Sequence, residues 1–292
     1  MTAKLSITKP HINPKKMLSD LLSLLINNGV DDPETTLDVL CAYVLGIDYS
    51  QLRLRRITKT LTFSPEQQET LRSFVLRRAD GEPLEYITGE RDFYGFTFRC
   101  RKNVLIPRND TEILVDAVSE AVRDGDRLLD LCTGTGCIGI SVSKIKNINA
   151  VLADISDDAL SCARENIESL GVSDRVMAVK HNIFTDSPDG VFDIITSNPP
   201  YITAEEMKEL SADVKNEPSL ALFGGDDGLD FYRTIAARYR PFIKNGGYIF
   251  FEVGYRQSAD VASILEKNGY TNIKTKKDYN NTERVVYARN SL

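Results

Sequence analysis

The segment at residues 193–203, DIITSNPPYIT, ends an apolar run in the tetrapeptide Asn198-Pro199-Pro200-Tyr201. Two prolines cannot continue a central strand, because each lacks an amide hydrogen and has a fixed φ. Their stiffness can hold the Asn198 side-chain oxygen and the Pro199 carbonyl as two converging acceptors, which match the two hydrogens of a planar NH₂ group. The Tyr201 ring can then lie against the plane of that group. An isolated asparagine at a strand end is usually only a turn residue, whereas this tetrapeptide predicts a clamp for a planar amine.

A second cluster of candidate residues follows a predicted strand at 127–132, in the sequence RLLDLCTGTGCIGISVSK. A short glycine turn between a strand and a helix lets a ligand approach the backbone at the carboxyl end of the strand. The turn is not the dinucleotide fingerprint, since Cys132 replaces the first glycine and Cys137 follows the last one. It is not a P-loop either, since no Gly-Lys-Ser/Thr follows. By itself, such a turn is equally compatible with a simple tight connection.

Asp154 ends the next predicted strand, about twenty residues after the glycine turn. At this position an α/β fold places an acidic side chain that accepts both hydroxyls of a ribose. Asp154 could instead cap the helix predicted at 156–170, although Ser156 or Asp157 can do the same. The turn and the acidic strand end together favour an adenosine-containing ligand.

An adenosine ligand beside a clamp for a planar amine indicates methyl transfer from S-adenosylmethionine to nitrogen. An amide nitrogen is a poor nucleophile because its lone pair is delocalised. A neutral hydrogen bond contributes only about 0.5–1.5 kcal/mol net. Holding nitrogen and methyl carbon in line can contribute on the order of 7–11 kcal/mol. The clamp is therefore expected to act mainly by orienting the amine.

This chemistry requires neither an acid at the sulfonium leaving group nor a strong general base. The chain contains only His11 and His181, so a histidine-based scheme is not expected. His181 follows the third predicted strand and is a secondary candidate for contact with adenine.

The pattern along the chain predicts two domains joined by a hairpin. Residues 1–80 contain helical segments at 13–29, 31–46 and 63–81 and no strand-like run. Residues 81–104 are rich in aromatic and β-branched residues, which is typical of a β-hairpin. Residues 105–292 alternate short apolar runs with helical patterns, which indicates a mostly parallel sheet with helices on both faces.

Seven strands and four of the helices of this α/β domain can be assigned from the pattern. The last two strands have no helix between them, so they should pair as an antiparallel hairpin at the end of the sheet. The strands are expected at 127–132, 149–154, 175–180, 192–197, 246–253, 270–277 and 283–289, and the helices at about 137–146, 156–170, 228–240 and 256–268.

The composition of the 292 residues, 42% hydrophobic and 27% charged, is ordinary for a soluble globular protein. The chain has no run of 18 apolar residues and no signal peptide, so we expect a cytoplasmic protein. Five scattered cysteines without a C-x-x-C pair argue against a disulfide framework or a zinc site, and no metal is expected.

The charge is unevenly distributed along the chain. Residues 1–80 hold 11 Lys and Arg against 9 Asp and Glu, whereas the remainder holds 25 against 33. The acidic remainder is a poor electrostatic match for a long nucleic-acid duplex. A protein or RNA–protein partner contacted through the N-terminal part stays possible.

The order of the motifs resembles the HemK/PrmC family, the glutamine methyltransferases that modify peptide chain release factors. NPPY alone is shared with amino-methyltransferases that act on adenine or cytosine, whereas PLEYITGERDFYG and VLIPRNDTE are more specific to the release-factor group. The resemblance spans most of residues 81–257, through GEPLEYITGERDFYGFTFRCRKNVLIPRNDTEILVD, LLDLCTGTGCIGIS, ADIS, FDIITSNPPYI, DVKNEPSLALFGGDDGLDFYRTI and FFEVGYRQ.

The resemblance implies a class I S-adenosylmethionine-dependent methyltransferase fold, a Rossmann-like seven-stranded sheet preceded by a small helical bundle. It implies cofactor contacts from the glycine turn, the acidic strand end and the residues near the clamp, namely Cys132, Thr133, Gly134, Thr135, Gly136, Asp154, Ile183, Asn198 and Phe93. It also implies a substrate site formed by Asn198, Pro199, Pro200, Tyr201 and Arg108, with Asn198, Pro199 and Tyr201 taking part in catalysis.

Some of these positions have equally good structural interpretations or depart from the family pattern. Phe93 can be a core aromatic and Arg108 a structural ion pair. Cys132 stands where many members have glycine, which should alter the turn. Asn109 stands where proline or glutamine often follows the arginine, and we expect it to cap the next helix. Ile183 stands where some members place a tryptophan over adenine, so an aliphatic adenine contact is implied.

The substrate implied by the resemblance is the glutamine of the Gly-Gly-Gln loop in a bacterial-type release factor. Its side-chain amide is a planar NH₂ group. Residues 1–80 would recognise the body of that factor, and we expect a monomer without stable nucleic-acid or membrane binding. A glutamine methyltransferase of a ribosomal protein is an alternative that the catalytic motifs do not exclude. The acidic balance disfavours an amino-methyltransferase of DNA or RNA, and the intact clamp, turn and Asp154 disfavour a non-catalytic module.

Overall fold

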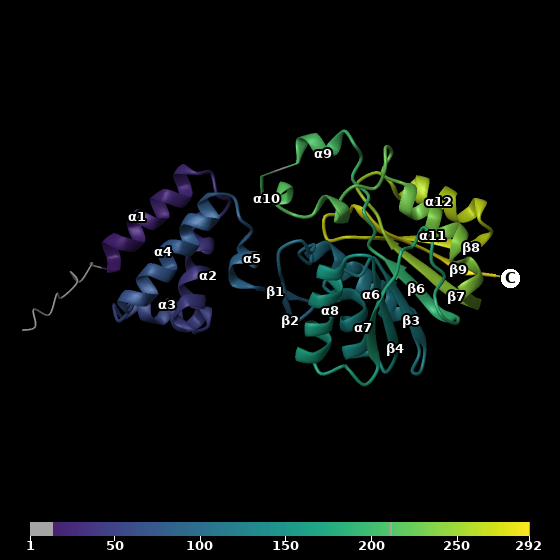
Figure 1. Ribbon diagram of the computed structural model, residues 1–292, viewed down its shortest axis with the longest axis horizontal. Coiled ribbons are helices and arrows are strands. Elements are labelled where there is room, and N and C mark those ends of the chain that lie inside the picture. The colour runs from purple at the N-terminus through teal and green to yellow at the C-terminus, as the bar shows by residue number, and fades with distance from the viewer. Residues whose placement is uncertain (1–13, 211, 292) are drawn as a thin grey trace, which may run out of the picture. The chain divides into compact units, whose positions relative to one another are not determined.

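The computed structural model describes residues 14–210 and 212–291 of the chain (Figure 1). The chain divides between Thr88 and Gly89 into two compact units. In its described part, the first unit consists of α1 (Pro14–Asn27), α2 (Pro33–Leu45), α3 (Tyr49–Ile57), α4 (Pro65–Ala79) and α5 (Leu84–Thr88).

The three helices predicted in the first unit are confirmed, and their ends follow the expected capping. The Asp32 side chain accepts a hydrogen bond from the Thr35 amide, and Gly46 ends α2 in the left-handed conformation. Ser64 and Gln67 form a reciprocal capping box at the start of α4. The buried core of this unit includes leucines from α1, α2 and α4, namely Leu21, Leu25, Leu37, Leu40 and Leu71. Residues 1–13, which include His11 and the predicted helix start at 13, lie outside the described residues.

Two short helices of the first unit were not predicted. Helix α3 buries only Leu52 and carries three arginines, so its sequence has no apolar stripe of helical period. Helix α5 lies within the predicted hairpin segment 81–104. The segment is therefore divided, with α5 in the first unit and the hairpin in the second.

The second unit begins with an antiparallel hairpin and continues into a seven-stranded sheet. The hairpin pairs β1 (Glu90–Phe93) with β2 (Phe96–Arg99). The sheet has the order β5-β4-β3-β6-β7-β9-β8. Its strands are β3 (Arg127–Leu131), β4 (Asn149–Asp154), β5 (Val176–Lys180), β6 (Phe192–Ser197), β7 (Ile243–Glu252), β8 (Tyr270–Lys277) and β9 (Glu283–Asn290).

All seven predicted strands are present, and the sheet is parallel from β5 to β7. The antiparallel pairing of β8 with β9 is confirmed. Strand β9 also lies antiparallel beside β7, so the C-terminal hairpin inserts its second strand next to the parallel part and leaves β8 at the edge.

Helices cover both faces of the sheet, as predicted (Figure 1). One buried cluster joins one face to α6 (Glu112–Ala121), α7 (Cys137–Ile145) and α8 (Asp157–Ser169). A second cluster joins the other face to α11 (Asp230–Arg238) and α12 (Ser258–Lys267). Successive residues of β7 alternate between them, since Phe250 belongs to the first cluster and Phe251 to the second.

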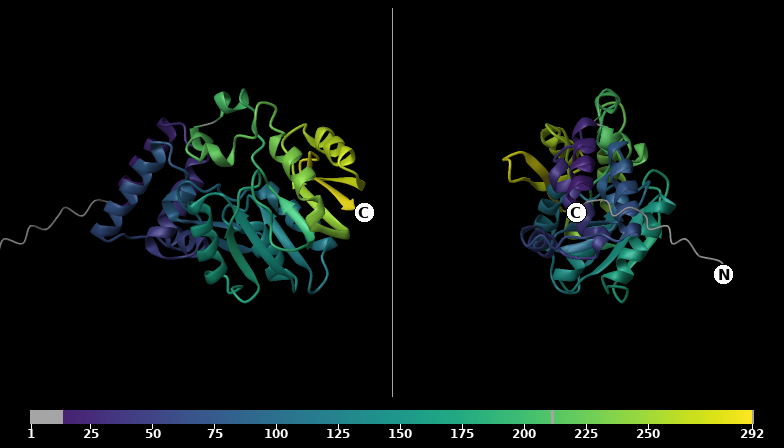
Figure 2. Two further views of the ribbon diagram at one scale, coloured as in Figure 1. Left: turned by 45° about the vertical axis from the view of Figure 1, so that its right-hand side comes forward. Right: turned by 90° about the vertical axis from the view of Figure 1, so that its left-hand side faces the viewer.

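A long connection between β6 and α11 interrupts this regular alternation. It carries the short helices α9 (Glu206–Glu209) and α10 (Ala212–Lys215) and the 3₁₀ turn η2 (Ser219–Ala221), and in Figure 2 it is the green segment that extends away from the sheet. Two further 3₁₀ turns are η1 (Asn109–Thr111) before α6 and η3 (Arg240–Phe242) before β7. None of the described helices is long and apolar enough to span a membrane.

Candidate active site

The predicted site residues lie mainly around one cavity of the second unit, at the carboxyl ends of β3, β4 and β6. Parallel pairing aligns Leu131 with Ala153 on one side and with Ser197 on the other, so the residues that follow these three strands meet at one edge of the sheet. The cavity is lined by ten of the sequence-predicted residues: Arg108, Cys132, Thr133, Gly134, Thr135, Asp154, His181, Ile183, Asn198 and Pro200.

The buried side chain of Asp130 is hydrogen-bonded to the glycine turn and holds it in place. Asp130 is fully buried, and its Oδ2 accepts hydrogen bonds from Thr133 Oγ1 at 2.5 Å and from the Gly139 amide at 3.2 Å. Burial raises the pKa of Asp130 to about 7. Because both partners belong to the turn and the start of α7, Asp130 fixes the position of α7 relative to the end of β3.

Cys132 adopts a left-handed backbone conformation at the start of the glycine turn. Its φ is 57°, which is uncommon for a residue with a Cβ. Glycine adopts such a φ without strain, and the expectation that Cys132 alters the turn stays a prediction. Gly136 does not line the cavity. A Cβ at Gly136 would lie 2.9 Å from both Ile140 Cδ1 and Leu152 Cδ1, so this glycine permits α7 to pack closely.

Asp154 lies on the cavity wall with both carboxylate oxygens bound to backbone amides. Oδ2 accepts from Gly134 and Oδ1 from Ser156, each at 2.9 Å. Ser156, not Asp154, caps α8 through a hydrogen bond from the Ala159 amide. Burial raises the pKa of Asp154. Since each carboxylate oxygen can accept more than one hydrogen bond, the group keeps acceptor capacity toward the cavity. This donor and acceptor set fits the ribose hydroxyls of an adenosine cofactor.

The Asn198 amide is oriented by residues behind it. Its Nδ2 donates to Thr111 Oγ1 at 3.2 Å, and within the described residues its Oδ1 has no hydrogen-bond partner. Glu252 is buried beside these two side chains. Burial raises the pKa of Glu252 to about 7, against the opposing effect of hydrogen bonding by Thr111 and Asn198. With the NH₂ end bonded to Thr111, the oxygen of Asn198 is the end available to the cavity.

The other three residues of the tetrapeptide are buried or partly buried. Pro199 and Pro200 are buried, and Tyr201 is partly buried. The Tyr201 side chain packs against the second core cluster, and burial raises its phenol pKa above the ordinary range. Pro200 lines the cavity, whereas Pro199 and Tyr201 are not among the residues that line it.

Comparison with known proteins identifies the family. Residues 16–89 match the PrmC N-terminal domain and residues 108–215 match the methyltransferase small domain. A release factor glutamine methyltransferase of Clostridium acetobutylicum is 41% identical over 222 residues, which cover 74% of this chain and 78% of that protein. A second, from Geobacter sulfurreducens, is 34% identical over 96% of this chain and 98% of its own length. The chain belongs to the release factor glutamine methyltransferase family.

Membership of the release factor glutamine methyltransferase family makes the chain an S-adenosylmethionine-dependent methyltransferase. The fold agrees with this assignment. A methyltransferase from Pyrococcus furiosus superposes with a TM-score of 0.53 at 18% identity, over 67% of this chain and 89% of that one. At this level of identity the likeness concerns the fold alone.

The structure favours the core interpretation of Phe93 and contradicts the helix cap that we expected from Asn109. Phe93 is 1% exposed, does not line the cavity and makes an edge-on contact with Phe98 in the core. It points inward because strand alternation exposes Asp92 and buries Phe93. Asn109 is the first residue of η1 and forms no cap. Its Oδ1 instead accepts a hydrogen bond from Arg91 Nη2 at 2.9 Å.

Arg108 and His181 line the cavity and also have structural partners. Arg108 forms an ion pair with the buried Glu217, and the other oxygen of Glu217 accepts from the Ile106 amide at 3.1 Å. This fixes the residue 106–108 segment at the cavity. His181 Nε2 is hydrogen-bonded to the Tyr239 hydroxyl at 2.6 Å, and burial lowers the pKa of His181.

Several residues of the site were not predicted from the sequence. The cavity is also lined by Asn103–Pro107, Thr111, Ile155, Asn182, Phe184, Leu220, Ala221 and Phe231. The segment VLIPRNDTE was recognised as specific to the family, and it could have indicated Ile106 and Thr111. Glu217 and Glu252 lie in the segments DVKNEPSLALFGGDDGLDFYRTI and FFEVGYRQ, which also carry the resemblance, but nothing in either segment reveals that its glutamate is buried.

Proposed function

We propose that this enzyme transfers a methyl group from S-adenosylmethionine to the side-chain amide nitrogen of the glutamine in the Gly-Gly-Gln motif of peptide chain release factors. The observation that carries the proposal is the orientation of the Asn198 amide. Its nitrogen donates to Thr111, and its oxygen is left for the cavity. An acceptor so fixed matches a primary amide of the substrate.

Some residues of the site would contact the cofactor, and others would contact the substrate. Bound S-adenosylmethionine supplies an electrophilic methyl group on a sulfonium. Asp154 would accept hydrogen bonds from the ribose hydroxyls. The backbone of Thr133–Gly136 would contact the cofactor, and Ile183 would pack on adenine. Asn198 Oδ1 and the Pro199 carbonyl would accept the two amide hydrogens of the substrate glutamine, and Tyr201 would support them.

In the transfer, the substrate amide nitrogen would form a bond to the methyl carbon as the carbon–sulfur bond of the sulfonium breaks. The electron pair of that bond would stay on sulfur, and the nitrogen would release one proton to solvent. The two acceptors would hold this nitrogen in line with the methyl carbon, and such alignment can contribute on the order of 7–11 kcal/mol. They also favour electron density on the nitrogen as it leaves the plane of the amide.

The first unit is proposed to recognise the body of the release factor. The relatives from Clostridium acetobutylicum and Geobacter sulfurreducens carry the name release factor glutamine methyltransferase, and the match to the PrmC N-terminal domain covers most of this unit. Residues 1–88 hold 11 Lys and Arg against 11 Asp and Glu, so this unit lacks the acidic excess of the rest of the chain. The expectations of a monomer and of no stable nucleic-acid binding stay predictions.

Intact-mass measurement and peptide mapping test the proposal. The enzyme and S-adenosylmethionine are incubated separately with a bacterial release factor, with ribosomal proteins and with duplex DNA. The expected result is one added methyl group on the Gly-Gly-Gln glutamine of the release factor. A release factor whose mass is unchanged, with methylated ribosomal-protein glutamine or methylated base in the parallel reactions, would overturn the proposal.

A further inference from the structure

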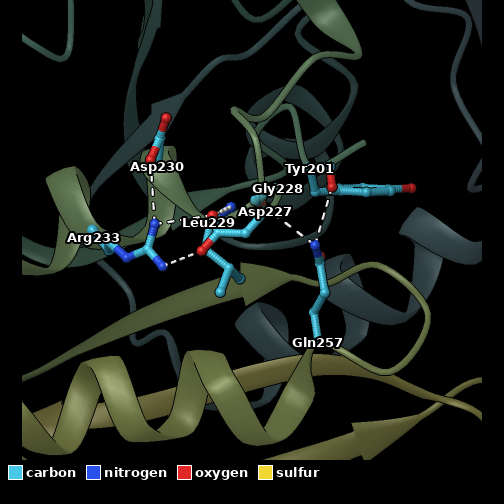
Figure 3. Close-up of polar contacts among 7 residues, drawn as sticks. All are labelled: Tyr201, Asp227, Gly228, Leu229, Asp230, Arg233 and Gln257. Carbon is cyan, nitrogen blue, oxygen red and sulfur yellow. Dashed lines mark hydrogen bonds and ion pairs between the residues drawn. The ribbon is translucent and has the colours of Figure 1, made fainter. Parts of the chain in front are cut away.

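Gln257, in the loop between β7 and α12, connects three segments of the second unit through its side-chain amide (Figure 3). Its Nε2 donates to the Tyr201 carbonyl at 3.0 Å and to the Gly228 carbonyl at 3.4 Å. Its Oε1 accepts from the Gly254 amide at 3.0 Å. Because carbonyls only accept and an amide N–H only donates, this is the one orientation of the side chain that satisfies all three groups.

The same stretch of backbone is approached closely by glycines. A Cβ at Gly224 would lie 2.6 Å from the Pro200 carbonyl oxygen and 2.6 Å from Tyr201 Cα. A Cβ at Gly228 would overlap the Tyr201 carbonyl oxygen, and one at Gly254 would lie 2.9 Å from Tyr201 Cδ2. Gly224 and Gly228 therefore admit the Pro200–Tyr201 backbone, and Gly254 admits the Tyr201 ring, only because they lack side chains.

Further hydrogen bonds join the connection after β6 to this backbone. The Ile202 amide donates to the Leu222 carbonyl at 2.8 Å, and the Gly224 amide donates to the Ile202 carbonyl at 2.9 Å. The Asp230 amide at the start of α11 then donates to the Gly224 carbonyl at 3.1 Å. The carboxyl side of the tetrapeptide is thus bound to the β6–α11 connection as well as to Gln257.

We propose that Gln257 is a positioning residue for methyl transfer, which holds the Tyr201 backbone and thereby directs the acceptors of the clamp at the substrate amide. Gln257 does not line the cavity, so it acts through the tetrapeptide and not by contact with cofactor or substrate. The two prolines have fixed φ, so a rotation at Tyr201 is passed on to the Pro199 carbonyl and to Asn198. The inference rests on the proposed function, because it assigns Gln257 a part in orienting the same amide.

Two variants of Gln257 test this role. Gln257→Met keeps the length of the side chain without its hydrogen bonds, and Gln257→Glu places a carboxylate oxygen against two carbonyl oxygens. We expect kcat for release-factor methylation to fall about tenfold to a hundredfold, more for Gln257→Glu than for Gln257→Met. The Kd of S-adenosylmethionine, measured by calorimetry, should stay within about twofold, because the cofactor contacts lie on other segments.

Arg233→Gln is the matched control on the neighbouring segment. Arg233 is exposed and pairs with Asp227 and Asp230, close to Gly228 but on the side away from Tyr201 (Figure 3). Its kcat should equal that of the wild type. Gly224→Ala provides a second probe of the same backbone, since the φ of Gly224 lies outside the left-handed region. It too should lose kcat at unchanged cofactor affinity.

The outcomes separate the two proposals. A wild-type enzyme that does not methylate the release factor overturns the proposed function, and this inference with it. Wild-type turnover together with unchanged kcat in the Gln257 variants and in Gly224→Ala overturns the inference alone. A parallel loss of cofactor affinity and kcat would make Gln257 a residue of general stability, which also overturns it. Loss of kcat alone supports the positioning role.

Discussion

At the scale of single residues, the partners of each polar group decide its role in the site. Asp154 is the last residue of β4 and Asn198 directly follows β6, and both were predicted from the sequence. The structure adds that Asp154 is bound to the Gly134 and Ser156 amides and that Asn198 is bound to Thr111. These partners leave acceptor capacity toward the cavity in each case. The sequence indicated the acceptors but not the groups that orient them.

Asp154→Ala should weaken S-adenosylmethionine binding by about tenfold to a hundredfold, because hydrogen bonds to a charged group contribute about 1.5–3 kcal/mol. Calorimetric titration measures this directly. Asp157→Asn is the matched control, since Asp157 is an exposed carboxylate three residues along that pairs with Lys180. Unchanged affinity in Asp154→Ala would remove Asp154 from the cofactor site.

Glu252 predicts a pH-dependent contribution to stability. Burial raises its pKa from 4.5 to about 7, so the folded state binds the proton more tightly than the unfolded state. Its contribution is fully present below about pH 4.5 and is lost as the pH rises through about 7. Thr111, Asn198, Arg284, Asp110, Tyr201, Tyr232 and Cys137 are the polar and titratable groups that interact with it.

Glu252→Gln lacks this titration. Its Tm relative to the wild type should therefore rise between pH 5 and pH 8, and thermal unfolding across that range measures the change. Glu120→Gln is the control, because Glu120 is exposed on α6. A Tm difference between Glu252→Gln and the wild type that is the same at both pH values would contradict the assignment.

At the scale of elements, the site depends on the carboxyl ends of strands and on the turns and loops that begin there. The seven strands could be predicted because strands buried on both faces form short apolar runs bounded by turn residues. The C-terminal hairpin could be predicted because five polar residues, DYNNT, leave no room for a crossover helix. The insertion of β9 beside β7 had no local signal, since strand order depends on contacts distant in sequence.

The connection between β6 and α11 could not be predicted for a related reason. It contains four-residue helices and a 3₁₀ turn, and its shape depends on hydrogen bonds such as that between Gly224 and Ile202. Helices this short have no apolar period. The ion pair of Arg108 with Glu217 joins residues 109 positions apart, so it too required the fold.

The turn after β3 provides a test of backbone conformation. Cys132 has a positive φ, which costs an L-residue roughly 1–2 kcal/mol. Cys132→Gly relieves this strain but raises the conformational entropy of the unfolded chain. The two effects oppose each other, so the free energy of unfolding should change by less than about 1 kcal/mol. Cys132→Val, which is β-branched, should lower it by about 1–3 kcal/mol. Urea denaturation measures both, and equal stability of the two variants would contradict a strained backbone at this turn.

At the scale of the whole molecule, the chain combines a helical unit with a methyltransferase unit of different charge. The helical unit was predicted from the capping residues that begin its helices and the glycines that end them, but its boundary was placed at residue 80. The structure extends it to Thr88, because Ile87 of α5 is buried in its core. The substrate-recognition role of this unit came only from the family resemblance, since its surface residues carry no motif of known chemistry.

Removal of residues 1–88 tests that role. The cut follows the structural boundary, because a cut at residue 80 would leave Ile87 without its core. The remaining unit contains every residue of the cavity, so its Kd for S-adenosylmethionine should stay within a few-fold of the wild-type value. The KM for release factor should rise at least about tenfold, as expected when a separate recognition surface is lost. An unchanged KM would show that the helices serve another purpose.

The most direct test of the central claim is the single-turnover rate of Asn198→Ala with release factor and S-adenosylmethionine. We predict a rate at least about a hundredfold below that of the wild type, because the acceptor that orients the glutamine amide is lost. We also predict cofactor affinity within a few-fold, because Asp154 and the glycine turn are untouched. Transfer at the wild-type rate by a folded Asn198→Ala enzyme would contradict the clamp on which the proposed mechanism depends.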